Sequence, residues 1–144
     1  MTSEVQAESD AGSETGLSAE DYAAIAAFRY RLRRFLAFSE AAAGREGLPP
    51  QQHQALLAIA GHAEVEPPSV GSLAVQLMIA PHTAAELATR MCDAGLLTKT
   101  PSAQDRRRMA LALTPKAESV LARLTTAHIE ELKVLKPALI QALG

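Results

Sequence analysis

Three consecutive arginines follow an aspartate in the last third of this 144-residue sequence, in the order Asp105, Arg106, Arg107 and Arg108. A guanidinium group suits phosphates and narrow minor grooves, because it is planar, permanently charged and rich in donors. We predict that Arg107 makes the main contact and that Asp105, two residues earlier, holds the Arg107 side chain in place rather than acting in catalysis. Arg106 and Arg108 would contact phosphates, or one of them would pair with a carboxylate.

The charge around these arginines is locally basic, although the whole chain has a net charge of -2. Between Ala80 and Lys116 there are six basic residues and three acidic ones: Arg90, Lys99, Arg106, Arg107, Arg108 and Lys116 against Glu86, Asp93 and Asp105. The basic excess therefore lies at the arginine cluster, where a phosphate backbone would be met.

A β-hairpin is predicted to carry the arginines. Residues 96–100 have the pattern of a strand, residues 101–105 that of a turn, and residues 109–113 that of a returning strand with Met109, Leu111 and Leu113 on one face. The arginines then stand at or beside the hairpin tip.

Two short helices are predicted before this hairpin. Val70, Leu73, Ala74 and Leu77 have the spacing of one buried helical face, and Ser69 is placed to cap a helix of about three turns. Pro81 suits the first turn of a second helix, because the amide that proline lacks would be unpaired there. We expect this second helix to bury Ala84, Leu87, Ala88 and Met91, and to end at Gly95.

The outer face of the second helix offers side chains that can read bases. His82 and Thr83 lie at its exposed start, although Thr83 could equally bond the backbone and His82 could simply face solvent. Glu86 would repel phosphates unless it accepts from a cytosine amine or pairs with Arg90. The predicted DNA-contacting residues are His82, Thr83, Glu86, Arg90, Lys99, Arg106, Arg107 and Arg108.

Helix, turn, helix and hairpin in this order make a winged helix-turn-helix, whose second helix can enter a major groove. The segments that carry this order resemble the MarR family of bacterial transcriptional regulators: SVGSLAVQL, IAPHTAAELATRMCDAGLL and DRRRMALALTPKAESVL. Asp105, Arg107 and the Leu113-Thr114 pair match the family's wing pattern, and Gly95-Leu96 matches its helix end. The resemblance covers roughly residues 18 to 143.

The flanks are predicted to be long helices on a mainly α fold. Residues 1–16 are acidic and poor in large apolar residues, so we expect them to be disordered. Within a domain spanning 17–144, residues 48–114 would form the DNA-binding lobe, and residues 17–47 and 115–144 the dimerisation helices. The first helix should run from about residue 19 to the low forties, where Gly44 and Gly47 break it, and the last should stop at Pro137, with a short helix after it.

The resemblance implies a homodimer that binds a pseudo-palindromic site, usually as a repressor, and that a small molecule releases. Broad apolar surfaces on both terminal helices agree with a twofold interface. Amphipathic character alone suggests an effector pocket lined by Tyr22, Phe28, Tyr30, Phe35 and His53.

Other chemistry has no support in the sequence. The lone cysteine, Cys92, excludes an internal disulfide and favours an inert thiol, with a redox role left open. The four histidines lack metal-ligand spacing, and no catalytic triad, phosphate loop or carboxylate pair is present, so neither an enzyme nor a cofactor is predicted. No apolar run is long enough to cross a membrane, and no signal peptide is evident, so we expect a cytoplasmic protein.

Ala84, Ala85 and Glu86 leave a second hypothesis open. A recognition helix poor in base-reading groups could belong to a winged-helix module that binds another protein, or that binds DNA without sequence preference.

Overall fold

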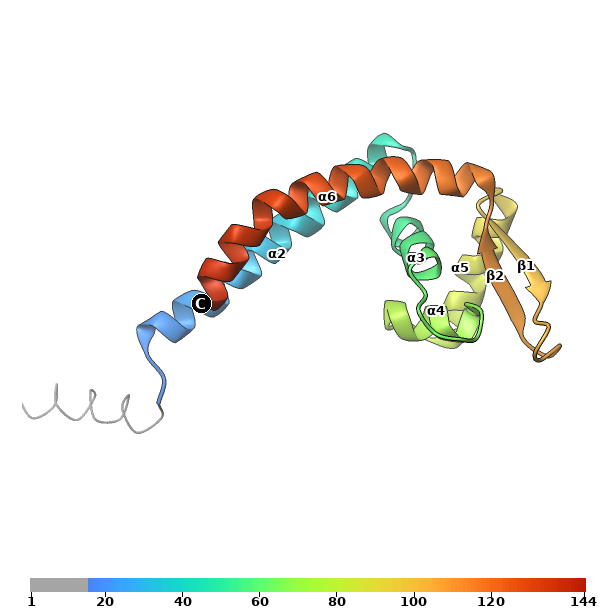
Figure 1. The fold of residues 1–144 in the computed structure, drawn as a ribbon, viewed down its shortest axis with the longest axis horizontal. Helices are drawn as coiled ribbons and strands as arrows, with labels where there is room; N and C mark the ends of the chain where they lie inside the picture. Colours follow the sequence, from blue (N-terminus) through green and yellow to red (C-terminus); the bar gives the residue numbers. More distant parts are fainter. Residues whose placement is uncertain (1–15) are drawn as a thin grey trace, which may run out of the picture. The chain divides into compact units, whose positions relative to one another are not determined.

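The computed structural model describes residues 16–144, which form helices and one small sheet (Figure 1). The elements, in chain order, are α2 (Ala19–Arg45), α3 (Pro50–Ala60), α4 (Val70–Leu77), α5 (Pro81–Asp93), β1 (Leu97–Pro101), β2 (Met109–Leu113) and α6 (Pro115–Leu143). The acidic stretch predicted to be disordered lies outside the described residues, apart from Gly16. The mainly helical fold with a small hairpin confirms the predicted fold class.

The chain divides into two compact units. One unit is Ser39–Ile129, and the other combines the described residues up to Phe38 with those from Glu130 to the end. The predicted lobe at residues 48–114 falls within the first of these units.

α4 and α5 form the helix-turn-helix. Ser69 caps α4 reciprocally with Ser72: its Oγ accepts from the Ser72 amide at 3.2 Å, while its own amide donates to Ser72 Oγ at 2.8 Å. α4 has eight residues, so the prediction of about three turns was wrong. Met78 ends α4 in the left-handed conformation, at φ 56, and the chain turns there before Pro81 starts α5 as predicted.

β1 and β2 pair as an antiparallel hairpin, with Leu97 opposite Leu113 and Pro101 opposite Met109. Strand β2 has the predicted bounds, whereas β1 starts one residue later than predicted. The Leu96 amide still donates to Met91 O at 2.9 Å, and so belongs to the end of the preceding helix. A single bridge from Ser69 to Ala110 extends the hairpin on its other edge.

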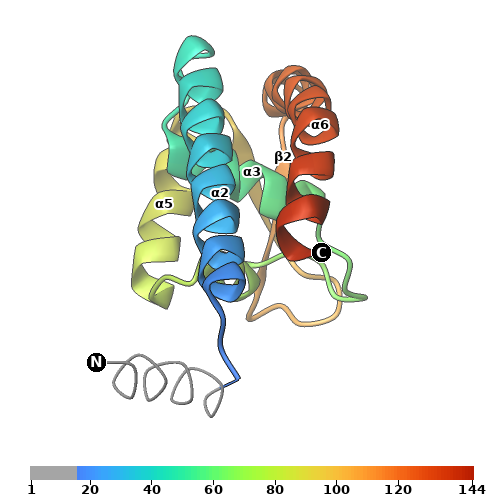
Figure 2. The ribbon, with the colours of Figure 1, turned by 90° about the vertical axis from the view of Figure 1, so that its left-hand side faces the viewer.

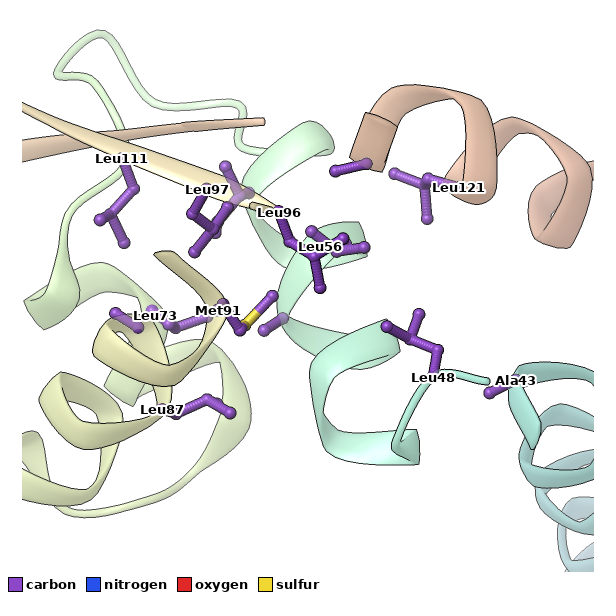
Figure 3. Packing of buried hydrophobic residues seen from close by; sticks show 14 of the residues in the cluster. Ala43, Leu48, Leu56, Leu73, Leu87, Met91, Leu96, Leu97, Leu111 and Leu121 are labelled. Carbon is purple, nitrogen blue, oxygen red and sulfur yellow. The ribbon is translucent and has the colours of Figure 1, made fainter. Parts of the chain in front are cut away.

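A core of leucines, alanines and a methionine joins these elements within Ser39–Ile129 (Figure 3). Leu56, Leu73, Leu87 and Met91 are its largest fully buried side chains. Leu57 of α3 is about half exposed, because Leu56 and Ile59 already occupy the inward face of that helix.

α6 begins at a cap and continues past a proline. Thr114 Oγ1 accepts from the Ala117 amide at 3.2 Å and donates to Gly95 O at 2.6 Å, which joins the end of the hairpin to the end of α5. The helix then runs through Pro137 to Leu143, so the predicted stop at Pro137 was wrong. Proline removes one intrahelical bond, but the good helix formers after it, such as Leu139 and Ala142, keep the helix going.

The end of α2 also differs from the prediction. Gly44 stays within the helix, which ends at Arg45, and the break comes at Gly47 with φ 70, a conformation that glycine adopts without strain. Just before this glycine, Glu46 accepts two bonds from Arg123 of α6, at 3.1 and 3.0 Å. This hydrogen-bonded guanidinium lowers the pKa of Glu46.

The second unit contains one helix from each end of the chain, the first part of α2 and the last part of α6 (Figure 2). Many of its large apolar side chains are exposed, among them Tyr22, Ile25, Leu32, Val134, Ile140 and Leu143. Among the described residues, no helix is both long enough and apolar enough to span a membrane.

Candidate nucleic-acid interface

α5 buries one face and presents the other. Ala84, Leu87, Ala88 and Met91 are buried as predicted, while the exposed positions include His82, Glu86, Thr89 and Arg90. The exposed face therefore carries a polar or charged side chain at each of these positions.

The start of α5 is rich in free donors. Its N-cap is Ala80, which has no side chain that could bond the first amides, and the first bonded amide is that of Ala84, at 3.0 Å from Ala80 O. The amides of His82 and Thr83 in the first turn thus have no intrahelical partner, and the helix dipole adds partial positive charge there. Thr83 is half-buried and His82 is exposed.

Thr89 connects α5 to the hairpin, a role that the sequence did not indicate. Its hydroxyl donates to Ala85 O at 3.0 Å and accepts from Lys99 Nζ at 3.3 Å. Lys99 lies on β1, so this contact fixes the predicted DNA-binding lysine against the recognition helix. A pair between Glu86 and Arg90, one of the two alternatives for Glu86, is absent from the ion pairs of the described residues.

Asp105 shapes the hairpin tip through the backbone. Its Oδ1 accepts from the amide of Arg107 at 3.0 Å, and its carbonyl accepts from the amide of Arg108 at the same distance. Ser102 closes the loop by donating its amide to Arg108 O at 2.9 Å. Asp105 therefore orients the main chain of Arg107, whereas the sequence had suggested a contact with its side chain.

Arg108 is the arginine of the cluster that pairs with a carboxylate. Its Nη1 lies 3.1 Å from Glu66 Oε2, and its Nε lies 4.0 Å from Asp105 Oδ2. Glu66 belongs to the loop before α4, where its carbonyl also accepts from His62 Nε2 at 2.8 Å. An exposed pair of this kind contributes up to about 1 kcal/mol, so its main effect is to orient the wing.

Arg106 and Arg107 keep their guanidinium groups available. Both are exposed, and within residues 16–144 neither side chain makes a hydrogen bond or an ion pair. A groove of about 850 Å³ lies beside Arg107, bounded by the loop before α4, by α4 itself and by Ala85 of α5. Arg107 and Arg108 line one side of this groove, which joins the wing to the recognition helix.

The residues suggested for an effector pocket lie in both units. Tyr22, Phe28, Tyr30 and Phe35 are on the first part of α2, with Tyr22 and Tyr30 exposed and the two phenylalanines half-buried. His53, in the other unit, is 4% exposed. A pocket shared by these five residues stays a prediction.

His53 has a histidine neighbour that the sequence did not reveal. Its ring lies 4.9 Å from the ring of His128, which bonds Leu124 O through Nδ1 at 2.6 Å and Ser39 Oγ through Nε2 at 2.8 Å. Because a carbonyl only accepts, His128 Nδ1 carries the proton, and in the neutral ring Nε2 accepts from Ser39. Burial lowers the pKa of His53 below its usual 6.5, and the nearby His128 lowers that pKa further.

Cys92 is half-buried against the core. No group of three or more possible metal ligands occurs among residues 16–144.

Comparison with known proteins agrees with this geometry. The sequence model of the MarR family matches residues 46–108, from the start of the lobe to the last arginine of the wing tip. A search of curated proteins finds no match.

Solved structures share the fold at low sequence identity. AbsC, a MarR family transcriptional regulator from Streptomyces coelicolor, is 18% identical with a TM-score of 0.67, over 83% of this chain and 80% of AbsC. A mutant of MepR from S. aureus, bound to an oligodeoxyribonucleotide, is 18% identical with a TM-score of 0.62, over 76% of this chain and 79% of MepR. CouR from Rhodococcus jostii RHA1, bound to p-coumaroyl-CoA, is 17% identical with a TM-score of 0.59, over 69% of this chain and 68% of CouR.

These structural similarities show the fold. The match to the family model shows that the helix-turn-helix and the wing also resemble the MarR family in sequence. MarR-family proteins are transcription regulators and not enzymes. Residues 46–108 thus match the MarR family in sequence, and the chain has the winged-helix fold of solved MarR family regulators.

Proposed function

We propose that this chain acts as a homodimeric repressor that binds a pseudo-palindromic operator and is released by a small molecule. One observation carries the DNA-binding part: the polar face of α5 and the unpaired guanidinium groups of Arg106 and Arg107 belong to one compact unit. Exposed apolar side chains on α2 and α6 support a dimer, which would place two such units on half-sites about one helical turn apart.

The candidate residues divide into base readers, phosphate contacts and positioning residues. His82, Thr83, Glu86 and Arg90 lie on or beside the outer face of α5, so we assign them to the major groove. Arg107 would enter the minor groove beside it, and Arg106 would contact phosphates. Lys99 is held at Thr89 of α5, and Arg108 at Glu66 of the loop before α4, so these two mainly set the position of the wing.

The burial of Ala84 weakens the rival hypothesis of a degenerate recognition helix. Ala84 is fully buried, so its small side chain serves the core and says nothing about lost base contacts. Glu86 stands without a partner among the described ion pairs, and it remains able to accept from a cytosine amine.

A small-molecule effector is proposed by analogy with a ligand-bound relative. CouR was solved with p-coumaroyl-CoA, which shows that a related fold holds an organic ligand. In this chain an effector would act by favouring one spacing of the two recognition helices, because a ligand shifts only an equilibrium between states that it binds unequally.

The test is fluorescence anisotropy with the DNA that flanks the gene, and with duplexes selected from a random library, at fixed salt. We expect a preference over scrambled DNA of roughly 1,000-fold. Arg107→Ala should weaken operator binding about tenfold and make its salt dependence less steep, because a backbone or minor-groove cation is lost.

Arg45→Ala is the matched control, because it removes an exposed arginine at the end of α2, away from the wing. The affinity of Arg45→Ala for the operator DNA should equal that of the wild type. Equal and weak binding of wild type to every duplex would overturn the proposal and favour a protein partner.

A further inference from the structure

A second pocket lies in the unit Ser39–Ile129, apart from the DNA-facing groove. It measures about 510 Å³ and is bounded by the end of α3, strand β2 and the first turns of α6. Ile59, Leu111, Leu113 and Leu121 give it mainly apolar walls. None of the five residues suggested for the effector pocket lines it.

Glu118 is the ionisable side chain in the lining of this pocket, and Thr125 supplies a hydroxyl. Within residues 16–144 the Glu118 carboxylate makes no hydrogen bond and no ion pair. Glu118 lies in the first turn of α6, at the N-terminal end of the helix. The pocket thus combines apolar walls with one uncompensated negative charge.

We propose that this pocket binds hydrophobic monovalent cations, with the positive charge beside Glu118 and the apolar body against Ile59, Leu111 and Leu121. Charge complementarity selects this class. A ligand carboxylate would be repelled by Glu118, and a neutral compound would gain nothing from it.

A ligand in this pocket would contact the wing directly, because strand β2 forms one of its walls. β2 supplies three consecutive lining residues, Leu111 to Leu113, and the Leu111 amide donates to Pro68 O at 2.8 Å beside them. A ligand packed against this strand would favour wing positions that leave the pocket open. This regulatory consequence rests on the proposed function, whereas binding to the pocket does not.

The probe is tetraphenylphosphonium, a rigid cation with its charge inside four phenyl rings, titrated into the full chain by calorimetry. Tetraphenylborate, with nearly the same shape and the opposite charge, is the matched control ligand. We expect saturable binding of the cation, and binding of the anion weaker by about tenfold or more. No saturable binding of the cation up to about 1 mM, or equal binding of both ions, would overturn the proposal.

Protein variants locate the site. Glu118→Gln should weaken binding of the cation about fivefold and leave binding of the anion unchanged or stronger, since an exposed charge pair is worth little more. Glu40→Gln, which removes an exposed carboxylate from α2, should have no effect. Ala122→Leu and Ala60→Leu each place a larger side chain in the pocket from a different helix, and both should abolish saturable binding.

Thermal unfolding followed by circular dichroism identifies any variant that fails to fold. If one of the two pocket-filling variants, Ala122→Leu or Ala60→Leu, does not fold, binding to the other one tests the proposal. Undiminished binding to a folded filling variant would place the ligand elsewhere and overturn the proposal. So would a loss of self-association in both filling variants during sedimentation, because a second copy of the chain would then be the occupant. A failure of operator binding together with normal cation binding would reject the proposed function alone.

Discussion

At the scale of single residues, the wing tip shows which contacts sequence can predict. Asp105 and Arg107 are close in sequence, and the Arg107 amide donates to Asp105 Oδ1 at 3.0 Å. The sequence pattern therefore predicted that these two residues interact, but not that the contact is with the backbone of Arg107. Arg108 is different, because its partner Glu66 lies 42 positions away and no periodicity connects them. The contact between Thr89 and Lys99, and that between His53 and His128, were missed for the same reason: folding creates these neighbours.

The pair of histidines predicts that acid destabilises the fold. The pKa of His53 is lowered in the folded protein, so as the pH falls through 6.5 the unfolded chain takes up more protons than the folded one. The free energy of unfolding should therefore be highest above this pH and should fall below it. Thermal unfolding measured between about pH 7.5 and about pH 5.5 should show the decline.

His53→Gln removes the titrating group and should flatten this pH dependence. His82→Gln is the control, because His82 is exposed at the start of α5, and it should leave the wild-type decline intact. Parallel curves for the wild type and His53→Gln would show that another group is responsible.

At the scale of elements, boundaries marked by caps were predicted and boundaries set by tertiary context were not. Ser69, Pro81, Gly95 and Thr114 act locally, and the structure has a helix end at or beside each of them. Pro137 was expected to end α6, but the bonds of the residues around it sustain the helix. Whether Leu57 is buried depends on which elements pack around α3, and the periodicity of an eleven-residue helix does not determine this.

The capping box of α4 can be tested directly. Ser69→Ala leaves the Ser72 amide without its acceptor, and should lower the free energy of unfolding by about 1 kcal/mol. Urea unfolding followed by circular dichroism measures the change. Thr126→Ala is the comparison: the Thr126 hydroxyl bonds Ala122 O within α6, where alanine is the better helix former, so this variant should be neutral or slightly stabilising.

At the scale of the whole molecule, the exposed apolar side chains of α2 and α6 favour burial against a partner. The sequence predicted this from the width of the apolar faces, and the structure leaves Ile25, Ile140 and Leu143 mostly exposed. The arrangement of two subunits could not be predicted, because it depends on how two copies fit together.

Sedimentation should therefore show a dimer at micromolar concentration, and Ile140→Glu should shift it toward monomer, because a charge would be buried at the interface. Ile140 is 61% exposed and Val65 of the loop before α4 is 96% exposed, so Val65→Glu makes the same change outside the terminal helices. Val65→Glu should stay dimeric. A wild type that is monomeric at all concentrations would remove the dimer from the proposal.

The turn between α4 and α5 has one further consequence, for the chemistry of sulfur. Met78 holds φ 56 and is 92% exposed, whereas Met91 on the inner face of α5 is 0% exposed. Peroxide reaches an exposed thioether readily, and adding oxygen there disturbs no packing, while a sulfoxide at Met91 would place a polar group in the core. The helix-turn-helix thus carries an oxidisable thioether at its turn and a shielded one beneath its recognition helix, and oxidation of Met91 marks the loss of the fold.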